Sequence, residues 1–426
     1  MKYLHIENNL FITNRKKFES KLEKNTLAIF NSNDIMPTNA DGTMPFRQNN
    51  DLFWMSGIDQ EESVLVIYPD NNQEKEILFL KETNDHIAIW EGSKLTKNEA
   101  TNVSGVENIY WLSEMDEKLQ DLIKKCDGIY LNKNMHSRST SEVETRDDRF
   151  RRKISLKYNK NILEVAPIMH ELRAIKCSSE ISLMQKACDI TEMGLRRILP
   201  YIKPGVMEYE IEAEIMHEFL KNRSTGFAYQ PIIGSGRDSC VLHYIENNKK
   251  CKDGEILLMD FGAEYANYAS DLTRTVPVNG RFSKRQKDIY NSVLYVMKEA
   301  TKMLRPGTLF KDYNMEVGKI MESELIKNGL LKKYEVQKQD PKKPLFRKYF
   351  MHGTSHYLGL DVHDVGSFDW AMKEGMVFTC EPGIYILEEE LGIRLENDIL
   401  ITSEGPHDLM ENIPIEIDEI EDLMNS

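Results

Sequence analysis

The feature that most constrains this chain is an order of elements that occurs twice in its second half. A helical segment, a Pro-Gly pair and a second helical segment are repeated, with the pairs at Pro204-Gly205 and Pro306-Gly307, 102 residues apart. In each helical segment, apolar or small residues recur at helical spacing and so lie on one face of the helix. In the first copy these residues are Ile181, Met184, Ala187, Cys188, Thr191 and Leu195 before the Pro-Gly pair, and Ile211, Ile215 and Phe219 after it. In the second copy they are Ile289, Val293, Val296 and Ala300. Each copy precedes a β-rich block. Because self-similarity at a fixed spacing indicates a duplicated unit, we expect two similar halves in one domain.

The first β-rich block is EILLMDFGAEYANYASDLTRTVPV, in which Asp260 lies within an apolar strand and Asp271 opens the return strand. With the turn centred between Tyr265 and Ala266, these two carboxylates face each other across an antiparallel hairpin. Opposed carboxylates repel, and burying them is costly unless a positive charge lies between them. The block therefore predicts a cation site, with an exposed hairpin face as the alternative.

The second β-rich block, MVFTCEPGIYILEEELGIRLENDILIT, also pairs two carboxylates. Glu381 ends one strand and Glu396 lies on the next, with the acidic turn Glu388–Glu390 between them. Their midpoint falls between Glu388 and Glu389, so a hairpin centred there places Glu381 opposite Glu396. Two such hairpins, each behind a helix pair, predict two half-domains that close around a shared centre.

Histidines are concentrated just before the second block, in MHGTSHYLGLDVHDVG. His352, His356 and His363 are three of the ten histidines and fall within twelve residues. Two glycines inside this segment argue against one continuous helix, so it differs from the HxxxH helix of zincins. A lone histidine is usually structural, but three beside two carboxylate pairs favour metal ligation and proton transfer. His243, in CVLHYIEN, is a fourth candidate.

Four carboxylates and an imidazole form an oxygen-rich set of ligands. Such a set suits hard or borderline cations, with Mn²⁺ the most natural and Fe²⁺, Co²⁺ or Zn²⁺ as alternatives. Two divalent cations carry four positive charges and neutralise four carboxylates, whereas one would leave excess negative charge. The residues therefore predict a two-metal site, which lowers the pKa of a bridging water and clamps reacting oxygens.

The first part of the chain has the pattern of an α/β domain. Short apolar β-rich segments occur at residues 26–32, 63–68 and 75–80, and a strand–helix–strand pattern follows at 108–112, 115–125 and 128–132. At 426 residues the chain exceeds what one core usually supports. We expect two domains, residues 1–170 and 171–426, with the boundary within the stretch from Pro167 to Ser179.

Composition restricts the partners and the compartment. The formal net charge of −14 argues against a nucleic-acid-binding surface. No stretch approaches the roughly 18 apolar residues that cross a bilayer, and the N-terminus lacks an apolar signal core, so we expect no membrane association. The six cysteines form no CxxC pair and are interpreted as reduced thiols. These observations predict a cytoplasmic protein.

Several segments together resemble one known family. In chain order, the five residues Asp260, Asp271, His356, Glu381 and Glu396 resemble the metal ligands of the pita-bread metallopeptidases, which include methionine aminopeptidase, prolidase and aminopeptidase P. The resemblance extends from about residue 172 to the C-terminus, through DFGAEYANYASDLTRT, HGTSHYLGLDVHDVG, EPGIY and GIRLEND. The histidine segment is most similar to that of aminopeptidase P, and MPFRQNNDLFWMSG is similar to the N-terminal domain of aminopeptidases P and long prolidases. The resemblance implies an α/β N-terminal domain followed by an α+β pita-bread catalytic domain whose duplicated halves are related by a pseudo-two-fold axis.

The resemblance also implies roles for the ligands. Asp271 and Glu396 would bridge both metals, Asp260 would chelate one, and His356 and Glu381 would complete the other. A bridging hydroxide would attack the scissile carbonyl, with Glu381 as the proton shuttle.

Further residues of this sequence match family positions around the ligands. His243 and His363 would steady the tetrahedral intermediate and the substrate, and His352 would relay protons or orient the substrate. Arg394 would support the carboxylates, with an exposed strand arginine as the alternative. Tyr385 would pack against the proline ring of the substrate; the alternative is a tyrosine in the core of the protein.

Two further positions are compared with the family: one matches a residue at a subunit contact, and the other departs from the family pattern. Trp90 would reach the pocket of a neighbouring subunit, or be an ordinary buried tryptophan. Asn397 departs from the family pattern, because relatives often place an acid there.

The activity implied is that of an Xaa-Pro aminopeptidase, which removes the N-terminal residue from peptides with proline at position two. The alternative is prolidase, which uses the same metal centre on dipeptides. An inactive member of the family that only binds peptides is disfavoured, because all five ligands are present. The resemblance also implies a homo-oligomer, either a dimer or a tetramer.

Overall fold

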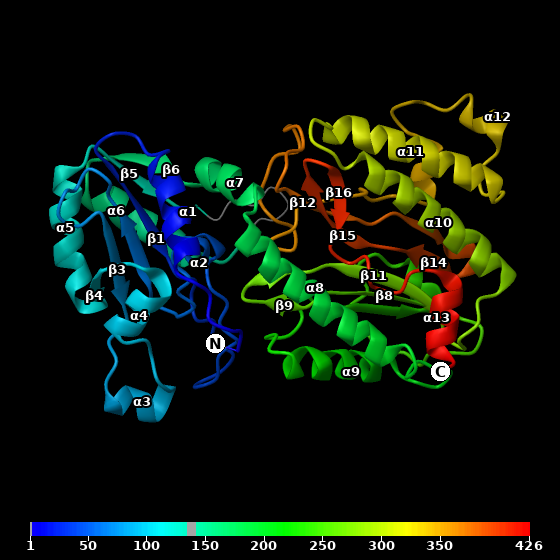
Figure 1. The fold of residues 1–426 in the computed structure, drawn as a ribbon, viewed down its shortest axis with the longest axis horizontal. Coiled ribbons are helices and arrows are strands. Elements are labelled where there is room, and N and C mark those ends of the chain that lie inside the picture. Colours follow the sequence, from blue (N-terminus) through cyan, green and yellow to red (C-terminus); the bar gives the residue numbers. More distant parts are fainter. Residues whose placement is uncertain (1, 134–141) are drawn as a thin grey trace. The chain divides into compact units, whose positions relative to one another are not determined.

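The structure, a computed structural model, describes residues 2–133 and 142–426 and divides into two compact units, Tyr3–Arg173 and Ala174–Ser426 (Figure 1). The division falls at the end of helix α7 (Ala166–Ala174). Each unit has its own sheets, helices and core, so we describe them one at a time. No helix in these two ranges combines the length and the apolar character needed to cross a bilayer.

The N-terminal unit contains a six-stranded mixed sheet in the order β4-β3-β2-β1-β5-β6. Its strands are β1 (Thr26–Asn31), β2 (Val64–Ile67), β3 (Glu76–Leu80), β4 (Asn108–Trp111), β5 (Gly128–Leu131) and β6 (Asn161–Glu164). Strand β1 is antiparallel to β2 and parallel to β5. The predicted strands of this region are confirmed, as is the helix predicted at residues 115–125.

Helices cover both faces of this sheet. They are α1 (Asn9–Glu19), α2 (Asn50–Ser56), α4 (Lys97–Ser104), α5 (Met115–Lys125) and α6 (Arg146–Lys157), with α3 (Asp85–Glu91) projecting beyond α4 (Figure 1). Leu27 and Ile29 of β1 belong to the core that includes residues of α5 and α6. Phe30 points to the opposite face, where its ring lies 5.2 Å from that of Phe18 in α1. Alternate residues thus enter two cores, which is why all six residues of β1 are buried.

The first half of the second unit pairs two helices with an antiparallel sheet. The helices are α8 (Ser178–Ile198) and α9 (Glu208–Lys221), and the sheet is formed by β7 (Ile232–Ser235), β8 (Ile256–Phe261) and β11 (Leu272–Pro277) in the order β11-β8-β7. A short hairpin of β9 (Glu264–Tyr265) and β10 (Tyr268–Ala269) connects β8 to β11.

The second half follows the same order. Helices α10 (Lys284–Met303) and α11 (Phe310–Lys327) are followed by the short α12 (Lys333–Val336) and by two small sheets. The sheets consist of β12 (Val377–Cys380), β15 (Asn397–Thr402) and β16 (Gly405–Asp408) in the order β12-β15-β16, and of β13 (Gly383–Ile386) with β14 (Leu391–Arg394). Helix α13 (Ile417–Met424) ends the chain.

The two Pro-Gly turns are equivalent in conformation. Gly205 and Gly307 have φ values of +102° and +89°, in the region that only glycine adopts without strain. The N–H of Gly205 donates to the Cys251 carbonyl at 2.8 Å, and the N–H of Gly307 donates to the Met372 carbonyl at 2.9 Å. Each turn therefore docks its helix pair onto a downstream loop of the same half, and the predicted duplication is confirmed.

A β-bridge joins the two halves at the centre of the unit. Thr273 on β11 pairs with Glu396, which lies between β14 and β15, and the Glu396 N–H donates to the Thr273 carbonyl at 3.1 Å. This bridge brings the acidic hairpin of one half against the acidic hairpin of the other.

Candidate metal centre

The first acidic hairpin has a different register from the one we predicted. Asp260 lies opposite Thr273, and Asp271 comes just before β11. The turn is centred between Ala266 and Asn267, one residue later than predicted. These two residues have φ values of +53° and +65°, which is the conformation of a tight two-residue hairpin turn.

The error in register does not separate the carboxylates. It shifts each partner by two residues, and because side chains alternate between faces with period two, Asp271 stays on the face of Asp260. The hydroxyl of Tyr229 lies 2.6 Å from Asp260 Oδ1 and 2.5 Å from Asp271 Oδ1, so it joins the two carboxylates.

The second acidic hairpin has the predicted register. Gly383 lies opposite Arg394 in one ladder, and Cys380 lies opposite Asn397 in the next. This register places Glu381 opposite Glu396 between the two ladders, and that prediction is confirmed.

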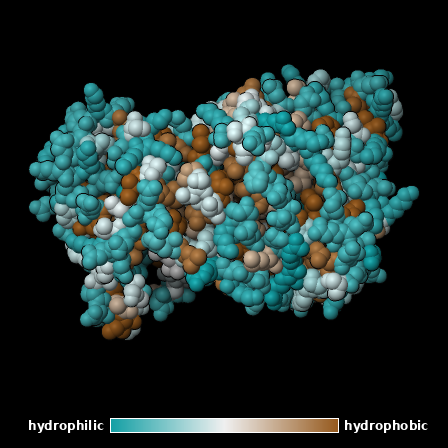
Figure 2. Space-filling model, in the orientation of Figure 1, coloured by the Kyte–Doolittle hydropathy of each residue, from teal (hydrophilic) through white to brown (hydrophobic). Residues whose placement is uncertain are grey.

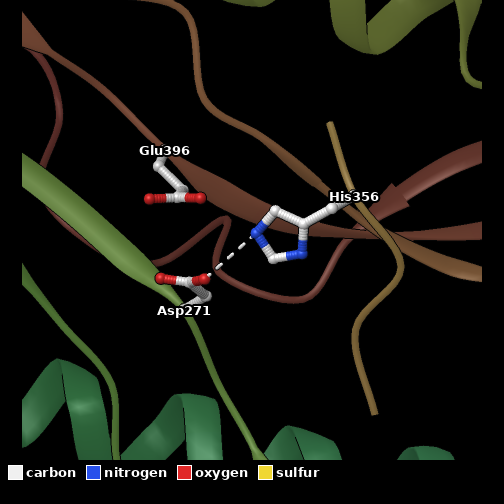
Figure 3. Close-up of side chains that lie close together, drawn as sticks. All are labelled: Asp271, His356 and Glu396. Carbon is white, nitrogen blue, oxygen red and sulfur yellow. Dashed lines mark ion pairs between the residues drawn. The ribbon is translucent and has the colours of Figure 1, made fainter. Parts of the chain in front are cut away.

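The two hairpins and the histidine segment meet at Asp271, His356 and Glu396, whose donor atoms all lie within 4.8 Å of one another. Figure 3 shows these side chains converging from three separate segments. The Nε2 atom of His356 is 3.4 Å from Asp271 Oδ2 and 3.9 Å from Glu381 Oε1. Its Nδ1 lies 2.9 Å from the Tyr357 carbonyl, which fixes Nδ1 as the protonated nitrogen and leaves Nε2 free to bind a metal.

Burial and neighbouring negative charges disfavour the ionised form of the carboxylates in this cluster. Burial, together with the charge of Asp271, raises the pKa of Glu381 to about 7 and raises that of Glu396 well above its usual value. Burial also raises the pKa of Asp260. Burial alone would lower the pKa of His356, but the Asp271 hydrogen bond and the Glu381 charge raise it to about 9. Buried carboxylates with one imidazole are the donor set of a hard or borderline divalent cation, so the residues fit such an ion.

Arg394 is buried beside the cluster. The alternative interpretation from the sequence, an exposed arginine on a strand, is therefore wrong. Its Nη2 lies 2.5 Å from Asp260 Oδ2, its Nη1 donates to the Tyr385 hydroxyl at 2.9 Å, and its Nε donates to Thr273 Oγ1 at 3.0 Å. The Thr273 hydroxyl in turn donates to Glu396 Oε2 at 2.7 Å. Arg394 thus orients carboxylates of both hairpins.

His352 is held through both of its ring nitrogens. Nδ1 lies 2.7 Å from the Gly353 carbonyl and Nε2 lies 2.8 Å from the Tyr385 hydroxyl. Because Tyr385 accepts from Arg394, its own proton goes to Nε2, and Nδ1–H donates to the carbonyl. Burial, with the nearby Arg394 charge, lowers the pKa of His352 to about 3, so the ring is neutral. Tyr385 is both a core residue and part of the site.

The other predicted histidines lie at different distances from the cluster. The ring of His363 stacks on that of His356, with centroids 3.9 Å apart and planes inclined by 26°. His243 is exposed on the loop after β7 and is among the groups whose proximity lowers the pKa of His352.

Trp90 lies in the other unit, on α3, and is 78 % exposed. The alternative that it is a buried tryptophan is therefore wrong. Ile89 beside it is 80 % exposed, so the tip of α3 presents two large apolar side chains, in a region where Figure 2 shows hydrophobic, brown surface.

Our sequence reasoning missed two residues that support the cluster. One is Tyr229, in FAYQP, a segment with no distinctive spacing. The other is the fully buried Asp398, whose Oδ2 accepts the backbone N–H of Asp271 at 3.0 Å. An acidic residue inside the apolar run DILIT was the available signal for Asp398.

The amide at position 397 is explained by its two partners. Arg274, which is fully buried, donates through Nη2 to Asn397 Oδ1 at 2.7 Å, and Asn397 Nδ2 donates to Asp408 Oδ2 at 2.6 Å. An amide accepts from the arginine and donates to the carboxylate at the same time, whereas an ionised acid at this position could only accept.

The fold and the site define a class of protein, and comparison with known families agrees. The sequence pattern of metallopeptidase family M24 matches residues 182–403, and that of the aminopeptidase P N-terminal domain matches residues 11–130. The chain belongs to metallopeptidase family M24. The predicted fold class, an α/β N-terminal domain and a pita-bread catalytic domain, is confirmed.

Individual relatives are similar over their whole length. The chain is 34 % identical to the Xaa-Pro aminopeptidase of Escherichia coli (strain K12) over 431 residues, and also 34 % identical to that of Haemophilus influenzae over 430, with 97 % of each chain covered in both cases. Among solved structures, the low-pH form of aminopeptidase P from E. coli matches with a TM-score of 0.89 at 33 % identity, and covers 99 % of both chains. The zinc-substituted E. coli enzyme in complex with product matches with a TM-score of 0.88.

Proposed function

We propose that this chain is an Xaa-Pro aminopeptidase, which releases the N-terminal residue from peptides with proline at position two. The observation that carries this proposal is the buried cluster of Asp271, His356 and Glu396, with Asp260 and Glu381 beside it, in a chain that aligns end to end with Xaa-Pro aminopeptidases of two bacteria. Its family and these relatives make it a metallo-aminopeptidase, as predicted.

The cluster would hold two divalent ions, for which we propose Mn²⁺. Asp271 and Glu396 would be shared by both ions, Asp260 would hold one of them, and His356 and Glu381 would hold the other. Four carboxylates balance two divalent charges, which supports two ions rather than one. When bound, such ions lower the pKa of water and stabilise negative charge on a substrate carbonyl oxygen.

Glu381 is the residue that we propose moves the proton. Its Oε1 lies 3.9 Å from Nε2 of His356, so this carboxylate lies at the edge of the proposed metal centre, where general acid–base catalysis requires a group that accepts and releases a proton. Its side chain is 20 % exposed, so it remains open toward the space that a peptide would enter. His352 has both ring nitrogens engaged within the chain, so we favour substrate orientation over proton relay as its role.

Proline in position two changes what the site must bind. The bond before proline is a tertiary amide with no N–H, so a peptidase that recognises this N–H loses its contact. The rings of Tyr385 and His352, with centroids 5.5 Å apart at 64°, would form a wall against which the proline ring packs. His243 and His363 would steady the carbonyl oxygen and the substrate backbone.

We further propose a homo-oligomer, a dimer or tetramer, in a cytoplasmic setting. The exposed tip of α3, with Trp90 and Ile89, supports contact with a neighbouring subunit, because large apolar side chains exposed together mark interaction sites. All six cysteines are free thiols, which supports a reducing compartment.

The proposal is tested by offering three peptides to the Mn²⁺-loaded protein: Xaa-Pro-Yaa, Xaa-Ala-Yaa and the dipeptide Xaa-Pro. We expect release of Xaa from Xaa-Pro-Yaa, with a much smaller kcat/KM for Xaa-Ala-Yaa. Cleavage of the dipeptide alone would identify prolidase activity instead. Glu381→Gln and His243→Ala should lower kcat by at least about 100-fold and 10-fold respectively, while His407→Ala, on the exposed side of β16, should leave it unchanged.

A further inference from the structure

A buried ion pair lies outside the metal cluster, and the roles proposed above do not account for it. Lys176 Nζ is 3.0 Å from Asp364 Oδ2, and both side chains are only 1 % exposed. The backbone N–H of Lys176 donates to the Gly375 carbonyl at 2.8 Å, which fixes the position of the backbone from which the lysine side chain extends. Removing two charges from water costs several kcal/mol per ion, so a buried pair is weak evidence of a stabilising role. Its location suggests a different one.

Asp364 immediately follows His363, whose ring stacks on the predicted metal ligand His356. The backbone N–H of Asp364 donates to the Tyr357 carbonyl at 2.9 Å, which closes the segment of residues 357–364 into a loop. His356 immediately precedes this loop and His363 lies near its other end, so the two stacked rings are at opposite ends of the loop. The ion pair lies directly beside His363.

Glycine at position 359 makes room for this pair. A Cβ atom there would lie 2.1 Å from Asp364 Oδ2 and 2.9 Å from Lys176 Cε. The Gly359 carbonyl also accepts the N–H of Ala269, on β10 of the first acidic hairpin, at 2.8 Å. A larger residue would push the carboxylate away from the lysine, so the loop is shaped around the ion pair.

We infer that Lys176 is a positioning residue for the hydrolysis reaction: through Asp364, it holds His363 in its stack on His356 and so sets where His363 meets the substrate. This inference rests on the proposed function. Without the lysine, the buried Asp364 carboxylate loses the cation that offsets the cost of its burial, and the loop that carries His363 is no longer held at Lys176. A displacement of about 1 Å at a substrate-orienting group is enough to cost roughly 100-fold in rate.

The experiment separates positioning from stability with two variants. Lys176→Met leaves the Asp364 carboxylate buried without the lysine charge, so we expect a clear fall in melting temperature. The double variant Lys176→Met/Asp364→Asn removes both charges at nearly constant volume and should regain most of that stability. We expect kcat for Xaa-Pro-Yaa to stay about 10- to 100-fold below wild type in the double variant, with KM within about twofold and unchanged Mn²⁺ content. Ile215→Ala, in the core of α9, is the control, because it destabilises without touching the loop and should keep wild-type kcat.

A cycle with His363→Ala completes the test. If the pair acts through His363, adding the double change to His363→Ala lowers kcat no further. Additive losses, or wild-type kcat in the stable double variant, would overturn the inference. A wild-type protein that does not cleave Xaa-Pro-Yaa would instead overturn the proposed function.

Discussion

Removing the metal ions should make the stability of the protein strongly dependent on pH. In the metal-free fold, burial first and then the charge of Asp271 raise the pKa of Glu381 from 4.5 to about 7. The folded state then holds a proton that the unfolded chain has released, so stability is lost as the pH rises from about 4.5 to about 7. At 1.36 kcal/mol per pKa unit, this shift amounts to about 3 kcal/mol.

His356 acts in the same direction over a higher range of pH. Its pKa in the metal-free fold is raised from 6.5 to about 9, so its stabilising contribution is complete below 6.5 and is lost as the pH rises to about 9. The contribution of Glu381 is lost mainly below pH 7 and that of His356 mainly above it, so the two losses of stability add. We therefore expect a total loss of about 6 kcal/mol between pH 5 and pH 9, or roughly 12 °C in melting temperature.

The assay compares thermal unfolding of chelator-treated and Mn²⁺-loaded protein at pH 5, 7 and 9. The gap between their melting temperatures should widen with pH, because bound cations replace the protons that the cluster otherwise needs. In Glu381→Gln, the difference between the two melting temperatures should increase less with pH than in the wild type. Glu404→Gln, at an exposed turn, should behave like the wild type. A gap that is the same at all three pH values would refute the charge argument.

Three further predictions follow from individual contacts. Tyr229→Phe removes the hydroxyl that joins two aspartates, and should weaken Mn²⁺ binding about 10- to 100-fold by calorimetry; equal affinity would contradict its supporting role. Asn397→Asp places a second carboxylate against Asp408, and should lower the free energy of unfolding by about 1–3 kcal/mol in denaturant titrations at pH 8. Asp408→Asn should recover that loss, and failure to recover it would show that the two carboxylates do not interact. Trp90→Ala should leave the melting temperature of the N-terminal unit unchanged, because the ring is exposed, but should lower the mass of the oligomer in light scattering; an unchanged mass would argue against α3 as a subunit contact.

The two acidic hairpins show how far residue spacing alone predicts the site. In the second, the acidic turn lies midway between Glu381 and Glu396, and counting from it gives the correct register. In the first, the chain turns at Ala266-Asn267, and neither residue is the glycine that usually marks a left-handed turn. The asparagine was a usable signal, since it tolerates that conformation. The two aspartates nevertheless lie together as predicted, because a shift of two residues keeps each side chain on the same face of the hairpin.

Other parts of the site depend on contacts that no local pattern encodes. Lys176 and Asp364 are 188 positions apart, and Tyr229 reaches Asp260 and Asp271 from a separate loop. A lysine beside the start of a helix and a tyrosine in a loop are usually exposed, so their sequence surroundings gave no reason to place them in a buried cluster. The position of Lys176 beside Asp364 follows from the packing of the two halves against each other, and that of Tyr229 from the packing of a loop against the sheet of the first half.

In the proposed enzyme, two divalent cations hold the acidic residues of both hairpins together. The most direct test is the metal content of the protein after equilibration with Mn²⁺ and removal of the unbound ion, measured by mass spectrometry. We predict two ions per chain in the wild type, and fewer in Glu396→Gln and in Asp271→Asn. Retention of no metal by the wild type, or of two ions by both variants, would contradict the account.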